Sequence, residues 1–161
     1  MSWKVMPAAE ACDLMDFWTA APWPLSQEEV QHLGVERFGW TIEVDNGKSY
    51  LFNRVSDFTI PDVMTIAYKD VVNYVTLRLS DTIKPTTPDS TAFLNDAFTL
   101  MVREGESRWG KTTLRDVEGT TTARWDVAGG ARIQFSFRPA GITAKFETPQ
   151  GVAVERKAGG R

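Results

Sequence analysis

Cysteine and histidine are scarce in this chain, and their scarcity limits its chemistry. The 161 residues contain one cysteine and one histidine, Cys12 and His32. One cysteine excludes an internal disulfide framework and a zinc or redox site of the CxxC type, and one histidine excludes a metal site with several histidine ligands. Histidine is also the side chain whose unperturbed pKa lies near neutrality. We therefore expect no metal, no cofactor and no enzymatic activity.

Long apolar runs are missing as well. No stretch approaches the roughly 18 apolar residues of a membrane-spanning helix. The first seven residues lack the apolar core of a signal peptide, and the acidic residues Glu10, Asp13 and Asp16 follow directly. Together with the single thiol, these features favour a cytoplasmic protein that does not contact a membrane.

The chain also lacks an excess of positive charge. It carries 18 basic and 21 acidic residues, a net charge of −3, which argues against non-specific binding to nucleic acid because such binding needs a clustered basic surface. Residues 1–45 hold two basic and eight acidic residues, whereas residues 46–161 hold sixteen basic and thirteen acidic ones. Two interpretations remain open: the acidic residues form the exposed faces of amphipathic helices, or they form a patch that meets a basic partner.

Apolar spacing and capping residues predict two helices near the start. The first is expected over residues 7–20, and its apolar residues fall at helical spacing: Ala8, Ala11, Met15 and Trp18. The second begins with a capping box formed by Ser26 and Glu29. Gly39 ends it, because glycine tolerates the left-handed conformation after a helix.

A third helix is expected over residues 90–105, with Asp89 or Ser90 as its cap. Its inner stripe is expected to contain Phe93, Ala97, Leu100 and Met101. Within and after this segment, residues 105–112 match the phosphate-binding pattern GxxxxGK[ST]. That loop needs a strand before it and a helix after it, whereas here a helix precedes it and an extended segment follows. We therefore interpret the match as the end of a helix.

Alternating apolar residues predict seven strands. They are expected around residues 40–44, 50–52, 62–69, 71–80, 123–127, 133–137 and 142–146. Trp40, Ile42 and Val44 are expected to share one strand face, and Asn46-Gly47 predicts a hairpin turn.

The predicted order of elements is α-α-β-β-β-β-α-β-β-β. It indicates an α+β fold with N-terminal helices and an antiparallel sheet, in which a central helix separates a four-strand from a three-strand segment. We expect a single domain over residues 1–157 and a disordered tail over residues 158–161.

Isolated residues could carry chemistry, but each also has a structural explanation. His32 is expected at the surface or boundary of the second helix, and Cys12 near the inner stripe of the first. Asp13 and Asp16 lie three residues apart on one helix face, so they are neighbours. Two adjacent carboxylates can act as an acid–base pair or bind a metal, but without further ligands a solvated face explains them as well.

Six tryptophans are an unusual feature of the composition. Trp18, Trp40 and Trp125 fit core positions, whereas Trp3, Trp23 and Trp109 fall near the terminus, between two prolines and beside a glycine. Exposed tryptophans anchor protein interfaces, and partly buried ones with a satisfied N–H are structural. Trp23 and Trp109 are therefore candidates for a partner interface.

The pattern of aromatic and glycine residues resembles a known family. The residues concerned are Trp18, Pro22-Trp23-Pro24, Phe38-Gly39-Trp40, Arg108-Trp109-Gly110, Arg124-Trp125, Gly129-Gly130-Ala131-Arg132-Ile133, Ile142 and Phe146. They resemble a family of small actinobacterial proteins with an uncharacterised domain, whose members are similar to immunity partners of secreted polymorphic toxins, including those of type VII secretion. The resemblance implies a cytoplasmic protein that binds a cognate toxin.

Two functions from different classes follow, with a third in reserve. The first is an immunity protein that neutralises a secreted toxin by blocking its active site, the toxin domain being encoded nearby. The second is a secretion chaperone or adaptor for an exported partner, and the third is a small enzyme, for which His32 or the Asp13 and Asp16 pair would have to line a pocket. We expect a monomer or weak dimer when free. The candidate partner-binding residues are Asp13, Asp16, Trp23, Glu28, Glu29 and Trp109.

Overall fold

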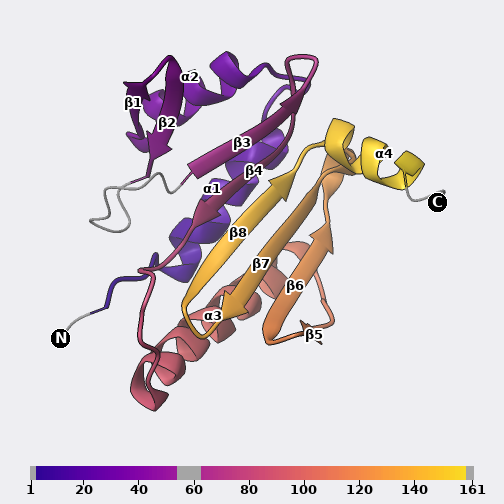
Figure 1. Ribbon diagram of the computed structural model, residues 1–161. Helices are drawn as coiled ribbons and strands as arrows, with labels where there is room; N and C mark the ends of the chain where they lie inside the picture. Colours follow the sequence, from indigo (N-terminus) through magenta and orange to yellow (C-terminus); the bar gives the residue numbers. More distant parts are fainter. Residues whose placement is uncertain (1–2, 54–62, 159–161) are drawn as a thin grey trace.

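The computed structural model describes residues 3–53 and 63–158 (Figure 1). Their elements are α1 (Ala8–Ala20), α2 (Gln27–Phe38), β1 (Thr41–Asp45), β2 (Lys48–Phe52), β3 (Val63–Tyr68), β4 (Val71–Arg78), α3 (Pro88–Trp109), β5 (Arg115–Val117), β6 (Thr120–Asp126), the short 3-10 turn η1 (Ala128–Gly130), β7 (Arg132–Arg138), β8 (Gly141–Glu147) and α4 (Pro149–Ala158). The predicted α+β class is confirmed, and the order of elements is close to the predicted one, with β5 and α4 added. Of the helices in these residues, none is both long and apolar enough to cross a membrane.

All eight of these strands form one antiparallel sheet. Their spatial order is β1-β2-β3-β4-β8-β7-β6-β5. The two halves of the sequence meet at the centre of the sheet, where β4 pairs with β8 and Val75 lies opposite Phe146. The central helix α3 connects these halves along the chain, as the predicted arrangement required.

Helices α1 and α3 cover one face of this sheet (Figure 1). The central strands bury apolar side chains on that face: Val75, Leu77, Ala123, Trp125, Ile133, Phe135, Ala144 and Phe146. Trp18 and Met15 of α1 and Leu94 and Met101 of α3 are fully buried against them. The predicted alternation of β4 and of the C-terminal meander is therefore confirmed.

The predicted boundaries of α2 are also confirmed. The Glu29 N–H donates to Ser26 Oγ at 3.1 Å, and the Ser26 N–H donates to Glu29 Oε1 at 3.0 Å. Gly39 follows the helix with φ 69°, the left-handed conformation that favours glycine. Local hydrogen bonding thus sets both ends of this helix.

Helix α3 begins before the predicted start. Thr87, rather than Asp89 or Ser90, is its N-cap, and Pro88 is its first residue. The Ser90 N–H donates to Thr87 Oγ1, and Ser90 Oγ accepts from the Thr87 N–H. Ser90 therefore belongs to the capping box three residues inside the helix, because proline fits the first helical position.

The end of α3 also differs from the prediction. The helix continues through Gly105 to Trp109, and a Cβ at Gly105 would lie 2.7 Å from Trp125 Cη2. Glycine is therefore required there for close packing rather than to end the helix. The phosphate-loop pattern begins inside a helix and leads to a strand, which confirms that its context is wrong. On the inner stripe, Leu100 is wrongly predicted: it is 55% exposed, and the buried residues are Leu94, Ala97, Phe98 and Met101.

Strand β1 is less buried than its alternation suggested. Trp40 is 2% exposed but precedes the strand, whereas Ile42 and Val44 are 40% and 70% exposed. The reason is topological, because β1 is the edge strand of the sheet and lies beyond the face that α1 and α3 cover. The predicted turn is confirmed, with Asn46 at φ 51° and Gly47 at φ 76°.

The C-terminal segment forms a helix that the sequence reading missed. Helix α4 packs against β4, where a Cβ at Gly151 would clash with the Asn73 carbonyl, and Val152 is 2% exposed. Ala158, the first residue of the predicted tail, is the last residue of α4. Residues 159–161 lie outside the described part of the chain.

Candidate functional site

Asp13, Asp16 and Trp109 converge on one point, but that point is a contact between α1 and α3. Arg108 Nη1 lies 2.7 Å from Asp13 Oδ1 and 2.9 Å from Asp16 Oδ2, and Arg108 Nε lies 2.8 Å from Glu104 Oε2. The Trp109 Nε1–H donates to Asp16 Oδ1 at 2.8 Å. We call these residues the helix clamp, since they join the two helices that cover the sheet.

The helix clamp compensates the negative charge of α1. Desolvation alone would lower the pKa of Arg108, but hydrogen bonds to Asp13, Glu104 and Asp16 outweigh it and hold the pKa above its ordinary value. Arg108 comes from the second half of the chain. In the folded protein its positive charge therefore partly neutralises the acidic excess of residues 1–45.

Trp23 is partly buried and packs against the aromatic core. Its Nε1–H donates to the Trp18 carbonyl at 2.6 Å, and its ring stacks on Phe146 with centroids 5.6 Å apart. Trp109 likewise contacts the core, with its ring 5.2 Å from that of Trp125. Both match the structural interpretation, a partly buried tryptophan with a satisfied N–H.

Glu28 and Glu29 lie at the exposed start of α2, away from the helix clamp. Hydrogen bonds from the Ser26 backbone and side chain hold the pKa of Glu29 below its ordinary value. Glu29 therefore stabilises the helix start, whereas Glu28 lies at the rim of the cavity described below.

His32 and Cys12 lie apart from any cavity found in the described residues. His32 Nε2 is 3.0 Å from Glu36 Oε1 on the exposed face of α2. Cys12 is fully buried, and burial raises the pKa of its thiol to about 12. Neither these residues nor the Asp13 and Asp16 pair lines the cavity described below or a second cavity beside the β5–β6 turn.

The largest irregularity of the sheet lies between β2 and β3. β1 and β2 pair along their full length, and β3 pairs with β4 from Val63 to Tyr68. In the described chain, by contrast, β2 and β3 pair only at Leu51 and Val63. The two strands therefore diverge, and beyond Val63 one edge of β3 has no strand partner among the residues that the structure describes.

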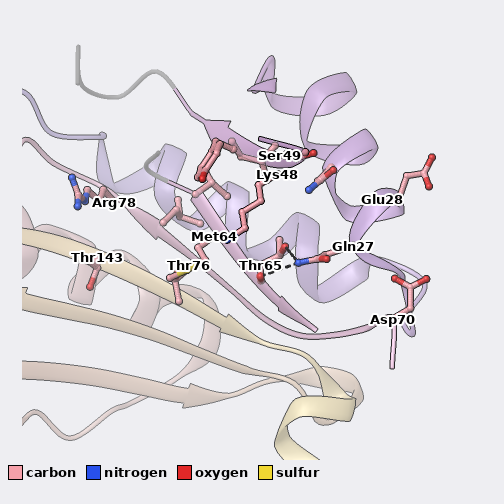
Figure 2. A pocket seen from close by; sticks show the side chains of 16 residues that line it. Gln27, Glu28, Lys48, Ser49, Met64, Thr65, Asp70, Thr76, Arg78 and Thr143 are labelled. Carbon is pink, nitrogen blue, oxygen red and sulfur yellow. Dashed lines mark hydrogen bonds between the residues drawn. The ribbon is translucent and has the colours of Figure 1, made fainter. Parts of the chain in front are cut away.

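A cavity of about 1050 Å³ occupies this divergence (Figure 2). Helix α2 and strands β2, β3 and β4 form its walls, and most of the lining side chains are polar. The polar lining includes Gln27, Ser49, Thr65, Thr76, Arg78 and Thr143. The Gln27 side-chain amide donates to the Thr65 carbonyl at 3.2 Å and to the Thr65 hydroxyl at 3.0 Å. This side chain therefore supplies a hydrogen bond to β3 at a residue that does not pair with β2.

Arg78 marks one end of the cavity. Its Nη1 is buried and has no hydrogen-bond partner within the described chain. A buried donor without a partner costs free energy, and a guanidinium is suited to a carboxylate because its N–H groups match both oxygens. Thr143, the register partner of Arg78 on β8, lies beside it (Figure 2).

Acidic side chains lie at the other end of the cavity. Figure 2 shows Glu28 of α2 and Asp70 of the β3–β4 turn on the side opposite Arg78. Both are exposed. Lys48 of β2 lines the cavity between these ends (Figure 2). The two ends therefore differ in charge, with Arg78 at one and Glu28 and Asp70 at the other.

A second group of charges lies beside α4. Arg132 is 3.1 Å from Asp126, 3.5 Å from Glu147 and 3.2 Å from Glu155. Burial, then the hydrogen bond with Glu155, raises the pKa of Glu147 to about 7. We call these four residues the α4 cluster. Through Arg132 of β7, these ion pairs tie Glu155 of α4 to Asp126 of β6 and Glu147 of β8. In the described chain, no set of three or more His, Cys, Asp or Glu residues is arranged to hold a metal ion.

One family model matches this chain. It describes a family of unknown function, DUF6301, and covers residues 9–148. The chain belongs to this family. The DUF6301 region includes the helix clamp and the cavity and ends just before α4, so Glu155 lies outside it. No curated protein and no solved structure matches the chain.

Within the DUF6301 region, sequence reasoning singled out Glu28 as a candidate for partner binding but did not identify Asp70, Arg78 or the cavity between them. Glu28 was a candidate because of local charge. In the sequence, Arg78 alternates with the apolar residues of β4, which is the pattern expected of any solvent-facing residue of a strand. Its importance depends on the divergence of β2 from β3, for which the sequence carries no local signal.

Proposed function

We propose that the protein binds another protein without chemistry of its own, as a cytoplasmic immunity protein that neutralises a cognate secreted toxin by blocking its active site. The observation that carries the proposal is an exposed acidic surface on α2 and β1. Its residues are Glu28, Glu29, Glu36, Glu43 and Asp45. We call these residues the acidic surface.

The acidic surface differs from the carboxylates of α1. Arg108 compensates Asp13 and Asp16, whereas only Arg37 and Lys48 supply positive charge along the stretch from α2 to the start of β2. Glu28, His32 and Glu36 follow each other at four-residue spacing and so lie on one helix face. Complementary charge accelerates association with a basic partner, which fits an inhibitor that covers a basic active site. The sequence resemblance to immunity partners of type VII-linked toxins agrees with this proposal.

The proposal is tested by co-expression with the product of the adjacent upstream gene. That product is expected to be toxic alone and harmless beside this protein. A product that is harmless alone, or that stays toxic beside this protein, contradicts the proposal.

The acidic surface is tested by reversing charge at Glu28 and Glu36. The double variant Glu28→Lys/Glu36→Lys is expected to bind the toxin at least about tenfold more weakly, with a flatter salt dependence, because exposed charges act through a salt-screened field. Glu29 is left intact because it caps α2. The matched control is Asp89→Lys/Asp96→Lys, which changes the net charge by the same amount at two exposed positions of α3 and is expected to bind like the native protein. Equal affinities of the two double variants in a calorimetric titration would move the interface elsewhere.

A secretion chaperone or adaptor is the second candidate. It is favoured by exposed apolar side chains on β3, where Met64 and Tyr68 are 56% and 63% exposed. Deleting the gene would then abolish export of the partner and leave protection unchanged, which is the reverse of the outcome expected for an immunity protein.

A further inference from the structure

The unpaired edge of β3 is suited to accept another strand. Beyond Val63, β3 has no registered partner in β2, and the Gln27 amide satisfies the Thr65 carbonyl instead. An open strand edge is a template for pairing with an extended segment, since main-chain N–H and C=O groups supply the affinity. The cavity supplies the space, because it is bounded by β2 and α2 on one side and by β3 and β4 on the other.

The charges at the two ends give this space a direction. Arg78 lies at the Val63 end of β3, since Val63 is paired with Leu77. At the other end of β3, Lys69 and then Asp70 form the turn to β4. Lys69 lies over the Tyr68 ring, whereas Asp70 lines the cavity and, with Glu28, is negative. A segment with its carboxylate at Arg78 and a basic group near Asp70 would therefore run antiparallel to β3, which is the pairing used throughout this sheet.

The length of β4 sets the length of the segment. The cavity is lined by residues from Asp70, just before β4, to Arg78, its last residue. The 8 residues of β4 span about 26 Å at about 3.3 Å per residue. A segment of about eight extended residues would reach from one charged end to the other.

We propose that the cavity binds an extended polypeptide segment of about eight residues, which pairs antiparallel with β3, places a carboxylate on Arg78 and places a basic residue beside Glu28 and Asp70. The carboxylate accepts a hydrogen bond from Arg78 Nη1, which otherwise has no partner within the described chain. A backbone N–H of the segment donates to the Thr65 carbonyl in place of the Gln27 amide. The inference goes beyond the toxin-inhibitor proposal, because it rests on β3 and Arg78 and holds for any polypeptide with these features.

The first experiment is a calorimetric titration of the full-length protein with two probes. One is an eight-residue peptide with lysine first, alternating valine and threonine after it, and a free C-terminal carboxylate; the other is the same peptide with a C-terminal amide. The acid is expected to bind at least tenfold more tightly than the amide. Equal binding of both forms, or no binding of either, overturns the proposal. A preference for the acid shows that Arg78 can bind the C-terminal carboxylate of a chain. The amide peptide with an added aspartate tests whether a side-chain carboxylate can bind there instead.

Variants assign the effect to Arg78. Arg78→Gln is expected to abolish the preference for the acid, and Arg78→Lys to retain part of it, which keeps the test valid if the glutamine variant folds poorly. Arg124→Gln, on an exposed residue of β6, is the matched control and is expected to keep the full preference. A preference that persists in Arg78→Gln overturns the proposed role of this residue.

Gln27→Ala and hydrogen exchange test the strand pairing. Removing the Gln27 amide frees the Thr65 carbonyl, so the acid peptide is expected to bind Gln27→Ala at least as tightly as the native protein. Bound peptide is expected to slow amide exchange within residues 64–68. Unchanged exchange there, or a peptide-free protein that proves to be a dimer through β3, overturns the assignment to a peptide segment. These outcomes leave the toxin proposal standing, because Arg78, Gln27 and β3, which they test, do not belong to the acidic surface.

Discussion

At the scale of single residues, Glu147 combines burial with charge. It is 6% exposed, lies next to Arg132, and shares a hydrogen bond with Glu155. Burial disfavours an ionised carboxyl, whereas Arg132 favours it. Burial outweighs the guanidinium, so the pKa of Glu147 rises to about 7. The hydrogen bond with Glu147 holds the pKa of Glu155, the exposed member, below its ordinary value.

This difference makes stability depend on pH. Between about pH 4.5 and 7, the folded chain keeps the proton on Glu147 that the unfolded chain releases, so the free energy of unfolding falls as pH rises. Glu155 acts in a different pH range: the stability that it contributes is present above pH 4.5 and is lost as pH falls through its lowered pKa.

Between pH 5 and 8, ionisation of Glu147 is expected to lower the free energy of unfolding of the native protein by about 1–3 kcal/mol. We predict that Glu147→Gln, which cannot ionise, does not show this decrease. Urea denaturation at both pH values measures it.

The control for this prediction is Glu10→Gln, on an exposed residue of α1. It is expected to unfold with the same pH dependence as the native protein. If Glu147→Gln also keeps the native slope, burial of Glu147 is not the source of the pH dependence.

At the scale of elements, the helix clamp joins α1 to α3. Its guanidinium is 23% exposed, and its three carboxylate partners lie between 35% and 69% exposed. We predict that Arg108→Ala lowers the free energy of unfolding by about 1–2 kcal/mol, since partly buried hydrogen bonds between charged groups are lost. Thermal unfolding at low and high salt measures it, and the loss is expected to shrink at high salt.

Arg103→Ala is the matched control for the helix clamp. Arg103 is an exposed arginine of the same helix, so its replacement changes the same net charge and helix propensity. A loss as large as that of Arg108→Ala would show that the effect comes from α3 itself rather than from its contact with α1.

The elements differ in how well the sequence predicted them. The capping box of α2, the Asn46-Gly47 turn and the alternation of β4 are local, because the residues that determine them lie within a few positions of one another. The exposure of Ile42 and Val44 was not predictable, since it depends on β1 being an edge strand. Arg78 and the helix clamp depend on contacts between distant segments, so residue spacing alone could not identify them.

At the scale of the whole molecule, the sheet joins two sequence halves. The first half contributes α1, α2 and β1–β4, and the second contributes α3, β5–β8 and α4. They meet where β4 pairs with β8, where α1 contacts α3, and where Trp23 stacks on Phe146. Each half alone would expose the apolar face that the other half covers.

A break in the connecting segment tests this dependence. Lys84, Pro85 and Thr86 are exposed, and we predict that a chain cut after Lys84 yields two halves that unfold without cooperativity when alone but form a cooperatively unfolding complex when co-expressed. Circular dichroism during heating measures it. A first half that unfolds cooperatively by itself would show that β4 does not need β8.

The central pairing of β4 with β8 also has a consequence for synthesis of the chain. β4 ends at Arg78, and its partner is complete only at Glu147. At about 5–20 residues per second, a ribosome needs roughly 3–14 s to make the intervening segment. During that interval β4 leaves the ribosome with an apolar face and an open edge, so a nascent chain of this protein passes through a stage at which it is open to mispairing and to capture by chaperones.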